Sequence, residues 1–478
     1  MSVQNPLRLL NLAGKSLLTD ETLSVSAVEH LPIELFPPLF MEAFCGRRRK
    51  TLKALVQAWP FVRLPLGGLM QTPHLGTLQA VLDGLDILLT QKDQPRRCKL
   101  RVLDLRNTGQ DFWRMWSGSS VHVSSSSSMA LGAEDTLRTQ QPLAPFEVFI
   151  ELHLKERSMG GFLTYLMRWV EERKASIHLC CKKLRIISFS MDNIMKVLSM
   201  VQLDCIQEVY VDRTWHLSTL AMFAPLLGQM TNLQRLLISH IHMPDSEEQE
   251  EEHVVKITSQ FLRLSLVSQL VINCHLSFQY LVPLFLPRCL MTPLDNLEIT
   301  HCLLTDSDLT HLSQSPNISH LRGLDLSGVT MTYSSTELLP ALLEKIASTL
   351  QELYLEQCGI RDSHLEAILP ALSHCIQLTC FSLCGNLLSM AIMEKLLQHT
   401  SGLPSLSQEL YPVPQEGFSS DRILQPGRLA QCRTELLEIL KHLRHPRTIW
   451  ISLTPCPHCG DNTFYRPEPI IYGGNTCA

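Results

Sequence analysis

Two stretches of the chain decide its fold: LQELYLEQCGI at residues 350–360 and LTCFSLCGNLL at residues 378–388. Both fit the pattern LxxLxLxxNxL, and Cys358 takes the place of the asparagine in the first stretch. In a leucine-rich repeat, these positions form a short strand with buried apolar residues, followed by a turn whose amides are satisfied by the Asn or Cys. One such unit cannot bury its own apolar edge, so several units must stack on one another.

The same spacing extends over seven expected strands. Their central residues are separated by 27, 34, 27, 27, 29 and 28 residues, and they are Val209, Leu236, Leu270, Leu297, Leu324, Leu353 and Phe381. Periods of this length leave room for a helix after each strand. The sequence therefore predicts an α/β fold, namely a leucine-rich repeat horseshoe (a solenoid) with a helical N-terminal cap.

Amphipathic helices are expected after two of these strands, because apolar residues recur there at helical spacing. The residues are Leu338, Leu339, Leu342, Leu343 and Ile346 in one segment and Leu365, Ile368, Leu369 and Leu372 in the next. The longest separation contains the acidic run EEQEEE at 247–252. A run of like charges is typical of a solvated surface, so we expect an insertion on a loop there.

The N-terminal region differs from the repeats. Residues 1–95 contain four expected helices, at 22–31, 35–44, 52–59 and 77–89, which are separated by prolines. Proline cannot donate a hydrogen bond within a helix, so it marks the boundaries. A helical block of this kind would cap the first repeat.

The repeats are expected to occupy residues 96–454. They begin at a strand with Leu100, Leu103 and Leu105, and a flexible serine-rich loop at 117–145 interrupts them. Degenerate repeats are expected at 149–189. After Leu388 the pattern fades in a proline-rich stretch, 403–426, before a helix at 429–440 and a strand at 449–453. Residues 455–478 form a C-terminal tail.

Composition restricts the possible partners and compartments. The net charge of −5 and the pI of about 6.4 argue against nucleic acid as a partner. No run of eighteen apolar residues is present, and the N-terminus does not have the pattern of a secretory signal, so no membrane association is expected. The sixteen cysteines are dispersed and are expected to be reduced. These features favour the cytoplasm and leave the nucleus open as a second compartment.

No constellation of catalytic residues is found, and the chain is expected to be a non-enzyme without a cofactor. The histidines are scattered over the repeats without the spacing of a metalloprotease or a catalytic triad. Cys456 and Cys459 form a CxxC that could be half of a zinc site, but a second pair of ligands is missing. The alternative is a tight turn after the last repeat.

Several unusual words in the sequence resemble the PRAME family, the preferentially expressed antigen of melanoma and its paralogues. The words cover the whole chain: SLLTDE at 16–21, LPIELFPPLF at 31–40, LKALVQAWPF at 52–61, AVLDGL at 80–85, LDLR at 103–106, LSQSP at 312–316 and PCPHCG at 455–460. The resemblance implies a substrate-recognition subunit of a cullin-2 RING ubiquitin ligase, joined to the scaffold through elongins B and C. It also implies repression of retinoic acid receptor signalling as an alternative function.

Two short patterns in the N-terminal cap are candidates for the ligase contact. An elongin-binding box, [S/T/P]LxxxCxxxφ, is matched by Thr22, Leu23, Ala27 and Leu31, with Ala27 in the place of the cysteine. A small residue there permits close approach of the partner helix. A cullin-2 box, φPxxφxxxφ, is matched by Leu31, Pro32, Leu35 and Leu39. The alternatives are that both patterns belong to the core of the cap, or that LPIEL opens an F-box and selects another cullin.

Receptor repression would require an LxxLL helix whose leucines fill a groove on the partner. Leu339, Leu342 and Leu343 are the candidate residues. In a repeat protein, the same leucines could instead face inward and pack against the strands.

The unknown protein substrate is expected to bind the strand face opposite the buried leucines. Alternation along a strand places Glu352, Tyr354, Cys380 and Ser382 on that face. The identity of the substrate and the oligomeric state cannot be deduced from the sequence.

Overall fold

The computed structural model describes residues 9–69, 74–90, 97–117, 145–155, 160–242, 247–273, 293–302, 304–332, 335–420, 423–443, 447–452 and 468–472. The chain divides into two compact units. Unit 1 comprises Met1–Leu184 and Ser188–Cys205, and unit 2 comprises Arg185–Ile187 and Ile206–Ala478. Each unit is an α/β structure with a largely parallel, open sheet.

Unit 1 begins with helices and continues with alternating strands and helices. Its helical elements are α1 (Leu9–Leu17), α2 (Glu21–Ala27), η1 (Val28–His30), η2 (Ile33–Leu35), α3 (Phe36–Cys45), α4 (Arg49–Gln57), η3 (Leu66–Leu69), α5 (Leu75–Thr90), α6 (Gln110–Ser117), α7 (Gly161–Glu171), α8 (Met191–Leu198) and η4 (Leu203–Cys205). The strands follow chain order: β1 (Arg63–Leu64), β2 (Val102–Asp104), β3 (Phe146–Leu154) and β4 (Ile177–Ile186). The four expected N-terminal helices are confirmed with small shifts in their ends.

An aromatic cluster forms the core of the helical part of unit 1. The rings of Phe40 and Trp59 lie 5.2 Å apart, and Phe40 also stacks on Trp113 of α6 at 5.7 Å. Phe36 meets Trp59 edge to face at 6.4 Å. Pairs with these geometries add about 0.5–1.5 kcal/mol each to the stabilisation from burial. The sequence words at 31–40 and 52–61 therefore supply the core of this region.

The sheet begins earlier than the sequence predicted. The first strand is β1, not the segment around Leu100, because Arg63 and Leu64 pair in parallel with Val102 and Leu103. The short turn after β1 requires a glycine. A Cβ on Gly67 would lie 2.0 Å from the carbonyl oxygen of Arg106, so only glycine allows this approach of the two backbones.

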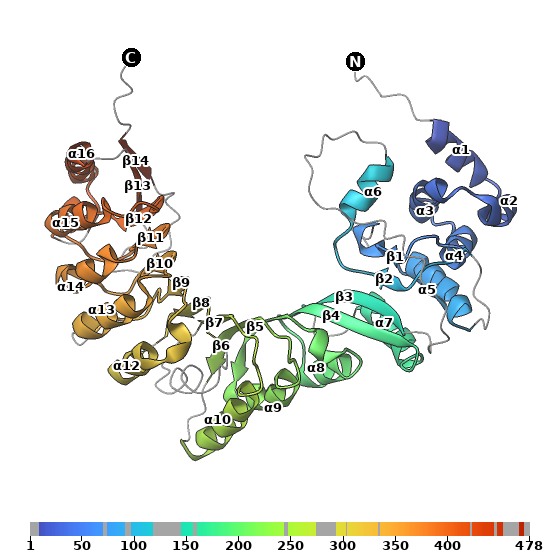
Figure 1. Ribbon diagram of the computed structural model, residues 1–478, viewed down its shortest axis with the longest axis horizontal. Coiled ribbons are helices and arrows are strands. Elements are labelled where there is room, and N and C mark those ends of the chain that lie inside the picture. Colours follow the sequence, from blue (N-terminus) through green and yellow to red (C-terminus); the bar gives the residue numbers. More distant parts are fainter. Residues whose placement is uncertain are drawn as a thin grey trace. The chain divides into compact units, whose positions relative to one another are not determined.

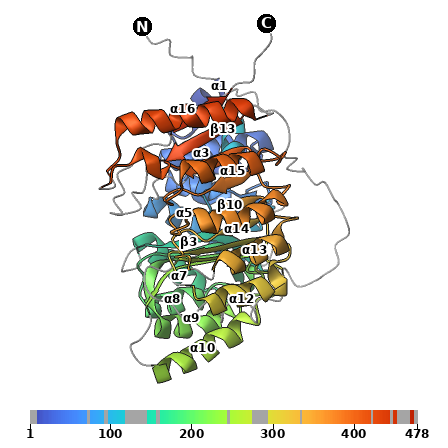
Figure 2. The same ribbon diagram turned by 90° about the vertical axis from the view of Figure 1, so that its left-hand side faces the viewer.

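Unit 2 repeats a strand and a helix. Its strands are β5 (Glu208–His216), β6 (Arg235–His242), β7 (Gln269–Asn273), β8 (Asn296–Thr300), β9 (Gly323–Asp325), β10 (Glu352–Tyr354), β11 (Cys380–Ser382), β12 (Gln408–Pro412), β13 (Arg447–Ser452) and β14 (Glu468–Tyr472). Its helices are α9 (Leu217–Leu227), α10 (Glu247–Phe261), α12 (Asp306–Gln314), α13 (Ser335–Ile346), α14 (Asp362–Ser373), α15 (Met390–Thr400) and α16 (Pro426–His442). Figures 1 and 2 show α12 to α16 stacked in chain order along one side of the strands.

The predicted register of the repeats is confirmed at every strand. Neighbouring strands pair in parallel, and the central residues expected from the sequence lie directly opposite one another: Val209, Leu236, Leu270, Leu297, Leu324, Leu353 and Phe381. All of them are buried. The helical residues Leu365, Ile368, Leu369 and Leu372 of α14 are buried as well. Burial of a side chain of this size stabilises the fold by about 1.5–3 kcal/mol.

The turns after the strands repeat as closely as the strands. The fourth residue after each strand centre has a positive φ in four successive units, with values of 55° at His301, 74° at Gly328, 53° at Gln357 and 72° at Gly385. The N–H of one such residue donates to the next unit: Gly328 to Glu356 at 2.7 Å and Gln357 to Cys384 at 2.8 Å. Each turn therefore depends on its neighbour for its hydrogen bonds.

Asn386 fulfils the role that the repeat pattern predicted. Its Oδ1 accepts from the backbone N–H groups of Cys358 at 3.1 Å and Ile360 at 3.0 Å. Its Nδ2 donates to the carbonyl oxygens of Leu355 at 2.7 Å and Leu383 at 2.8 Å. Cys358, in the equivalent position of the preceding unit, donates from Sγ to the carbonyl oxygen of Leu326 at 3.1 Å.

One expectation for unit 2 is wrong, and two strands occur there that the sequence did not predict. The acidic run at 247–252 lies in the first turns of α10 and not on a loop. Carboxylates are favoured at this end of a helix by the positive end of the helix dipole. The proline-rich stretch contains the strand β12, in which Glu409 stands where earlier units have an apolar residue. The C-terminal tail adds β14, which pairs antiparallel with β13. Most of the serine-rich loop, 118–144, lies outside the described residues.

Replacing Asn386 by alanine should lower the free energy of unfolding of unit 2 by about 3 kcal/mol or more. The change removes the partner of four buried backbone groups, and each unsatisfied group costs about 1–3 kcal/mol. Urea denaturation followed by circular dichroism measures the loss. The control is Gln398→Ala on the exposed side of α15, which should change the stability by no more than about 0.5 kcal/mol. Equal effects of the two substitutions would contradict the role assigned to Asn386.

Candidate protein-binding surfaces

The helix α2 is held in a fixed rotation about its axis. The Asp20 side chain caps its N-terminus by accepting from the N–H groups of Thr22 at 2.9 Å and Leu23 at 3.2 Å. On the inner side, the buried Ser24 donates from Oγ to the carbonyl oxygen of Leu17 at 2.7 Å, and Val28 one turn later is buried as well. The sides of the helix that carry Leu23 and Val25 therefore face away from the core.

This rotation leaves the first half of the candidate elongin box accessible. Leu23 is 55% exposed. Thr22 is also exposed, and Ala27 is half-buried. Leu23 and Ala27 are four residues apart, so they lie on one face of the helix. Leu31 is half-buried, and its carbonyl oxygen accepts from Nη1 of Arg97 at 3.0 Å.

The candidate cullin-2 box is only partly accessible. Pro32 is exposed and Leu35 is half-buried, whereas Leu39 in α3 is only 4% exposed. Leu39 lies between Phe36 and Phe40 in the chain, and both of these α3 residues belong to the aromatic cluster. In the described conformation, the box therefore offers Leu31, Pro32 and Leu35 to a partner, and Leu39 belongs to the core.

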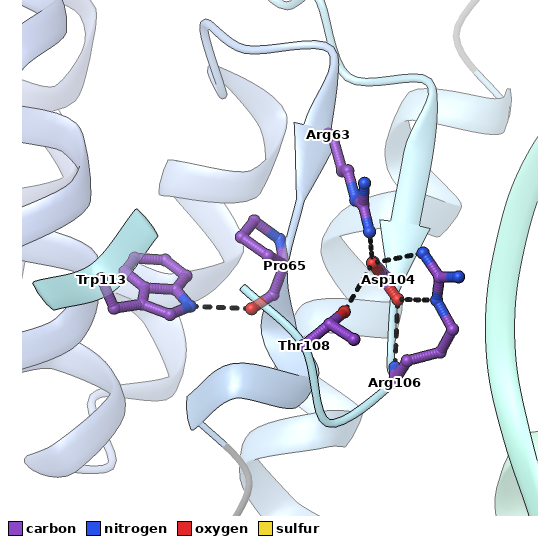
Figure 3. A network of polar contacts seen from close by, with 6 residues as sticks. All are labelled: Arg63, Pro65, Asp104, Arg106, Thr108 and Trp113. Carbon is purple, nitrogen blue, oxygen red and sulfur yellow. Dashed lines mark hydrogen bonds and ion pairs between the residues drawn. The ribbon is translucent and has the colours of Figure 1, made fainter. Parts of the chain in front are cut away.

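A buried polar network lies beside this region, at the end of β2 (Figure 3). The carboxylate of Asp104 is fully buried and accepts from the guanidinium of Arg63, from the Nε of Arg106 at 2.9 Å and from the hydroxyl of Thr108 at 3.3 Å. The Nε1 of Trp113 donates to the carbonyl oxygen of Pro65 at 2.8 Å. Burial, and to a lesser degree Arg106, lowers the pKa of Arg63.

This network joins two strands. The contacts of Asp104 in Figure 3 connect β1, β2 and the following turn. Its aspartate and Arg106 belong to the LDLR word at 103–106, which resembles the family sequence. The word therefore encodes a junction between β1 and β2 within unit 1.

Replacing Asp104 by alanine should destabilise unit 1 by about 3–5 kcal/mol, because it leaves the partly buried guanidinium groups of Arg63 and Arg106 without their counter-charge. Thermal and urea denaturation of the full chain measure this loss. Asp111→Ala is the control, since this exposed carboxylate forms only a surface ion pair with Arg114. If Asp104→Ala were as mild as the control, the network would not hold β1 and β2 together.

The candidate receptor-binding leucines do not form an accessible surface. Leu339, Leu342 and Leu343 lie in α13, and each is at most 1% exposed. They pack inward, as the alternative interpretation of the sequence expected. A partner groove could take them only if α13 left the sheet.

The open face of the unit 2 sheet carries the four predicted strand positions. Glu352 lies opposite Cys380, and Tyr354 lies opposite Ser382, in the pairing of β10 with β11. Glu352 is exposed, and Tyr354 and Cys380 are half-buried. The Sγ of Cys380 donates to the hydroxyl of Tyr354 at 3.3 Å. Ser382 is on the predicted face but is buried, and its Oγ donates to Oε1 of Glu356 at 2.5 Å.

Two acidic residues on the same face were missed by the sequence analysis. Glu298 in β8 and Asp325 in β9 lie opposite each other, and Asp325 lies opposite Tyr354. Burial raises the pKa of Glu298, and Asp325 and Glu352 raise it further against the opposing effect of Arg235. The sequence could have predicted them, because the same strand alternation that was applied to β10 and β11 places Glu298 and Asp325 on the open face.

The substitution Glu298→Gln should stabilise unit 2 at neutral pH. A carboxyl group whose pKa is higher in the folded than in the unfolded protein favours folding when protonated and opposes it when ionised. The gain over the unmodified chain should therefore be present at pH 7 and disappear as the pH falls to about 4. Urea midpoints over this range test the prediction. The exposed Glu394→Gln on α15 is the control, and an equal gain from it would contradict the explanation.

Three of the buried cysteines are poor candidates for chemistry. Burial raises the pKa of Cys181, Cys375 and Cys384 to about 12, so their thiols stay protonated and unreactive at neutral pH. Among the described residues, no group of three or more His, Cys, Asp or Glu side chains could hold a metal ion. Cys456 and Cys459 lie outside the described residues. In the part of the chain that the structure describes, no helix is long and apolar enough to cross a membrane.

The fold and these surfaces define an α/β protein of repeated strand–helix units, with an N-terminal helical region and an open sheet face. Comparison with known proteins gives the family. A model of the PRAME N-terminal domain matches residues 6–113, and a model of the PRAME C-terminal domain matches residues 146–474. The chain belongs to the PRAME family, as the sequence words predicted.

Human relatives are similar over almost the whole length. PRAME family member 8 of Homo sapiens is 48% identical over 474 residues, which cover 98% of this chain and 99% of the relative. PRAME family member 12 of Homo sapiens is 48% identical over 481 residues, which cover 100% of this chain and 99% of the relative. Their names state membership of the family and no enzymatic activity.

Proposed function

We propose that this chain is a non-catalytic adaptor that recognises the substrate of a cullin-2 RING ubiquitin ligase. The N-terminal helices bind elongins B and C and the cullin, the open sheet face of unit 2 binds a protein substrate, and other subunits transfer ubiquitin. We further infer that unit 2 is a leucine-rich repeat solenoid. The matching register of seven strands, the repeated positive-φ turns and the Asn386 hydrogen bonds support this inference.

The observation that carries the proposal is the exposure of Leu23. The α2 helix buries Ser24 and Val28 and leaves a leucine 55% exposed beside the small Ala27. A groove that accepts a leucine from a short helix, and that needs a small residue one turn later, fits this face. The ligase itself is the function that the family resemblance implies, and the exposed Pro32 and half-buried Leu35 extend the accessible surface toward a cullin contact.

No comparable observation favours the corepressor. Its three candidate leucines are buried in α13 and unable to fill a groove without local unfolding. The compartment implied by the adaptor is the cytoplasm, with the nucleus as a second place of action.

Replacing Leu23 by serine should weaken binding of the purified elongin B and C pair by about 10-fold or more. A leucine buried at an interface contributes about 1.5–3 kcal/mol, and each 1.4 kcal/mol is a factor of ten. Biolayer interferometry with the full chain measures the affinity, and circular dichroism shows that the helices persist.

Val25→Ser is the matched control. Val25 is 38% exposed on the same helix, and two residues of helical rotation point it away from the face of Leu23 and Ala27. This variant should bind within about two-fold of the unmodified chain. Unchanged binding by Leu23→Ser, or an equal loss from both variants, would reject the assignment of this face.

A further inference from the structure

The charged side chains on the open face of β8, β9 and β10 are all negative. They are Glu298, Asp325 and Glu352, which come from three neighbouring strands. Glu298, Asp325 and Tyr354 form one row across the strands. Neighbouring strands are about 4.8 Å apart, so three carboxylates and a tyrosine ring lie within reach of a single long side chain.

A glycine and a neutral amide lie beside these carboxylates. Gly323 of β9 lies between Asn296 of β8 and Glu352 of β10 in the paired register. It has no side chain, and a Cβ there would approach the amide group of Asn296 to 3.2 Å. The positions paired with Glu352 in β8 and β9 therefore add no charge to this face.

Among the described residues, little neutralises this negative charge, and the Asp325 carboxylate accepts only a backbone N–H, that of Ser327 at 2.8 Å. Within the described residues, neither Glu298 nor Glu352 makes a hydrogen bond or an ion pair. The basic group that acts on Glu298 is Arg235 in β6, two strands away. The Nη1 of Arg235 donates to the hydroxyl of Tyr210 at 3.0 Å, and its Nε donates to Gln269. A cation from a partner would meet carboxylates that still lack a close counter-charge.

The same row ends in an apolar patch. It continues from Tyr354 through Ser382 and Leu410 to Trp450, which is 38% exposed. From Asp325 in β9 to Trp450 in β13 there are four strand spacings, or about 19 Å. An extended polypeptide covers this distance with about six residues, at about 3.3 Å each.

We propose that this face binds an extended polypeptide segment that places lysine or arginine side chains among Glu298, Asp325 and Glu352, and an apolar side chain about six residues away on Leu410 and Trp450. The inference rests on the proposed function, because it names the chemistry of the segment that the adaptor would recognise. The carboxylates select the cationic side chain, and the ring of Tyr354 adds a cation–π contact. The indole of Trp450 supplies the large, flat contact area that is typical of binding anchors.

The test uses a fluorescein-labelled peptide of twelve residues in a Gly-Ser background, with an Arg-Lys pair and a leucine six residues after it. Fluorescence anisotropy with the full chain measures its affinity. The triple variant Glu298→Gln, Asp325→Asn, Glu352→Gln should weaken binding at least 10-fold, and so should Trp450→Ser. Added salt should weaken binding to the unmodified chain more than binding to the triple variant.

The matched control changes the net charge equally on the helix side. The triple variant Glu337→Gln, Glu394→Gln, Glu435→Gln replaces exposed carboxylates of α13, α15 and α16 and should bind within about two-fold of the unmodified chain. A second peptide of the same composition, with the leucine next to the Arg-Lys pair, should bind more weakly.

Three outcomes would overturn the proposal: equal loss in the two triple variants, equal affinity for the two peptides, or calorimetric binding of Ca²⁺ at the carboxylates without any binding of the peptide. Elongin capture by the same samples separates this proposal from the proposed function. If the unmodified chain captures elongin but does not bind the first peptide, only the open-face inference is rejected. Intact peptide binding with no elongin capture by the unmodified chain rejects the ligase adaptor and leaves a binding protein of another kind.

Discussion

The hydrogen bonds between successive turns are the constraint on which unit 2 depends. A turn with a positive φ points its N–H out of its own unit, and the acceptor is a carbonyl of the next one, as between Gln357 and Cys384. Buried backbone groups must be paired, so no unit can complete its turn alone. Asn386 closes two turns at once, because it satisfies the N–H groups of the preceding unit and the carbonyl of its own. Apolar packing supplies most of the stabilisation, but these hydrogen bonds fix the register in which the packing occurs.

The register of unit 2 could be predicted because the physical rule is local and periodic. A leucine at each strand centre fixes which face is buried, and a shift by one residue would turn every leucine outward. The prediction ended at β12 because Glu409 stands opposite Phe381 in the core column. This carboxylate is buried and accepts from the hydroxyl of Tyr411 at 2.7 Å. Two polar residues that are hydrogen-bonded to each other can thus occupy buried positions of a strand. A search for apolar residues at regular spacing does not find such a strand.

The candidate binding sites were likewise predictable only in part. The spacing of Leu23 and Ala27 could be recognised in the sequence. The exposure of Leu23 follows from the burial of Ser24 and Val28, and the residue types of these two do not predict that they are buried. The same patterns placed Leu39 beside Pro32 as a partner contact, and tertiary packing places Leu39 in the aromatic cluster instead. Short patterns of alternating apolar residues fit both a binding helix and a core helix, so the outcome is decided by packing that a single segment does not encode.

Most of the words that carry the family resemblance serve stability. Phe36, Phe40 and Trp59 form the aromatic cluster, and Asp104 joins β1 to β2. The acidic row on the open face belongs to a different set of positions. The positions that alternate with the buried leucines, such as Glu298 and Glu352, take no part in the turn hydrogen bonds or the apolar core. A substitution there changes the charge offered to a partner without changing the register. The repeat architecture thus separates the residues that fold the chain from positions on the open face whose charge can change without disturbing the fold.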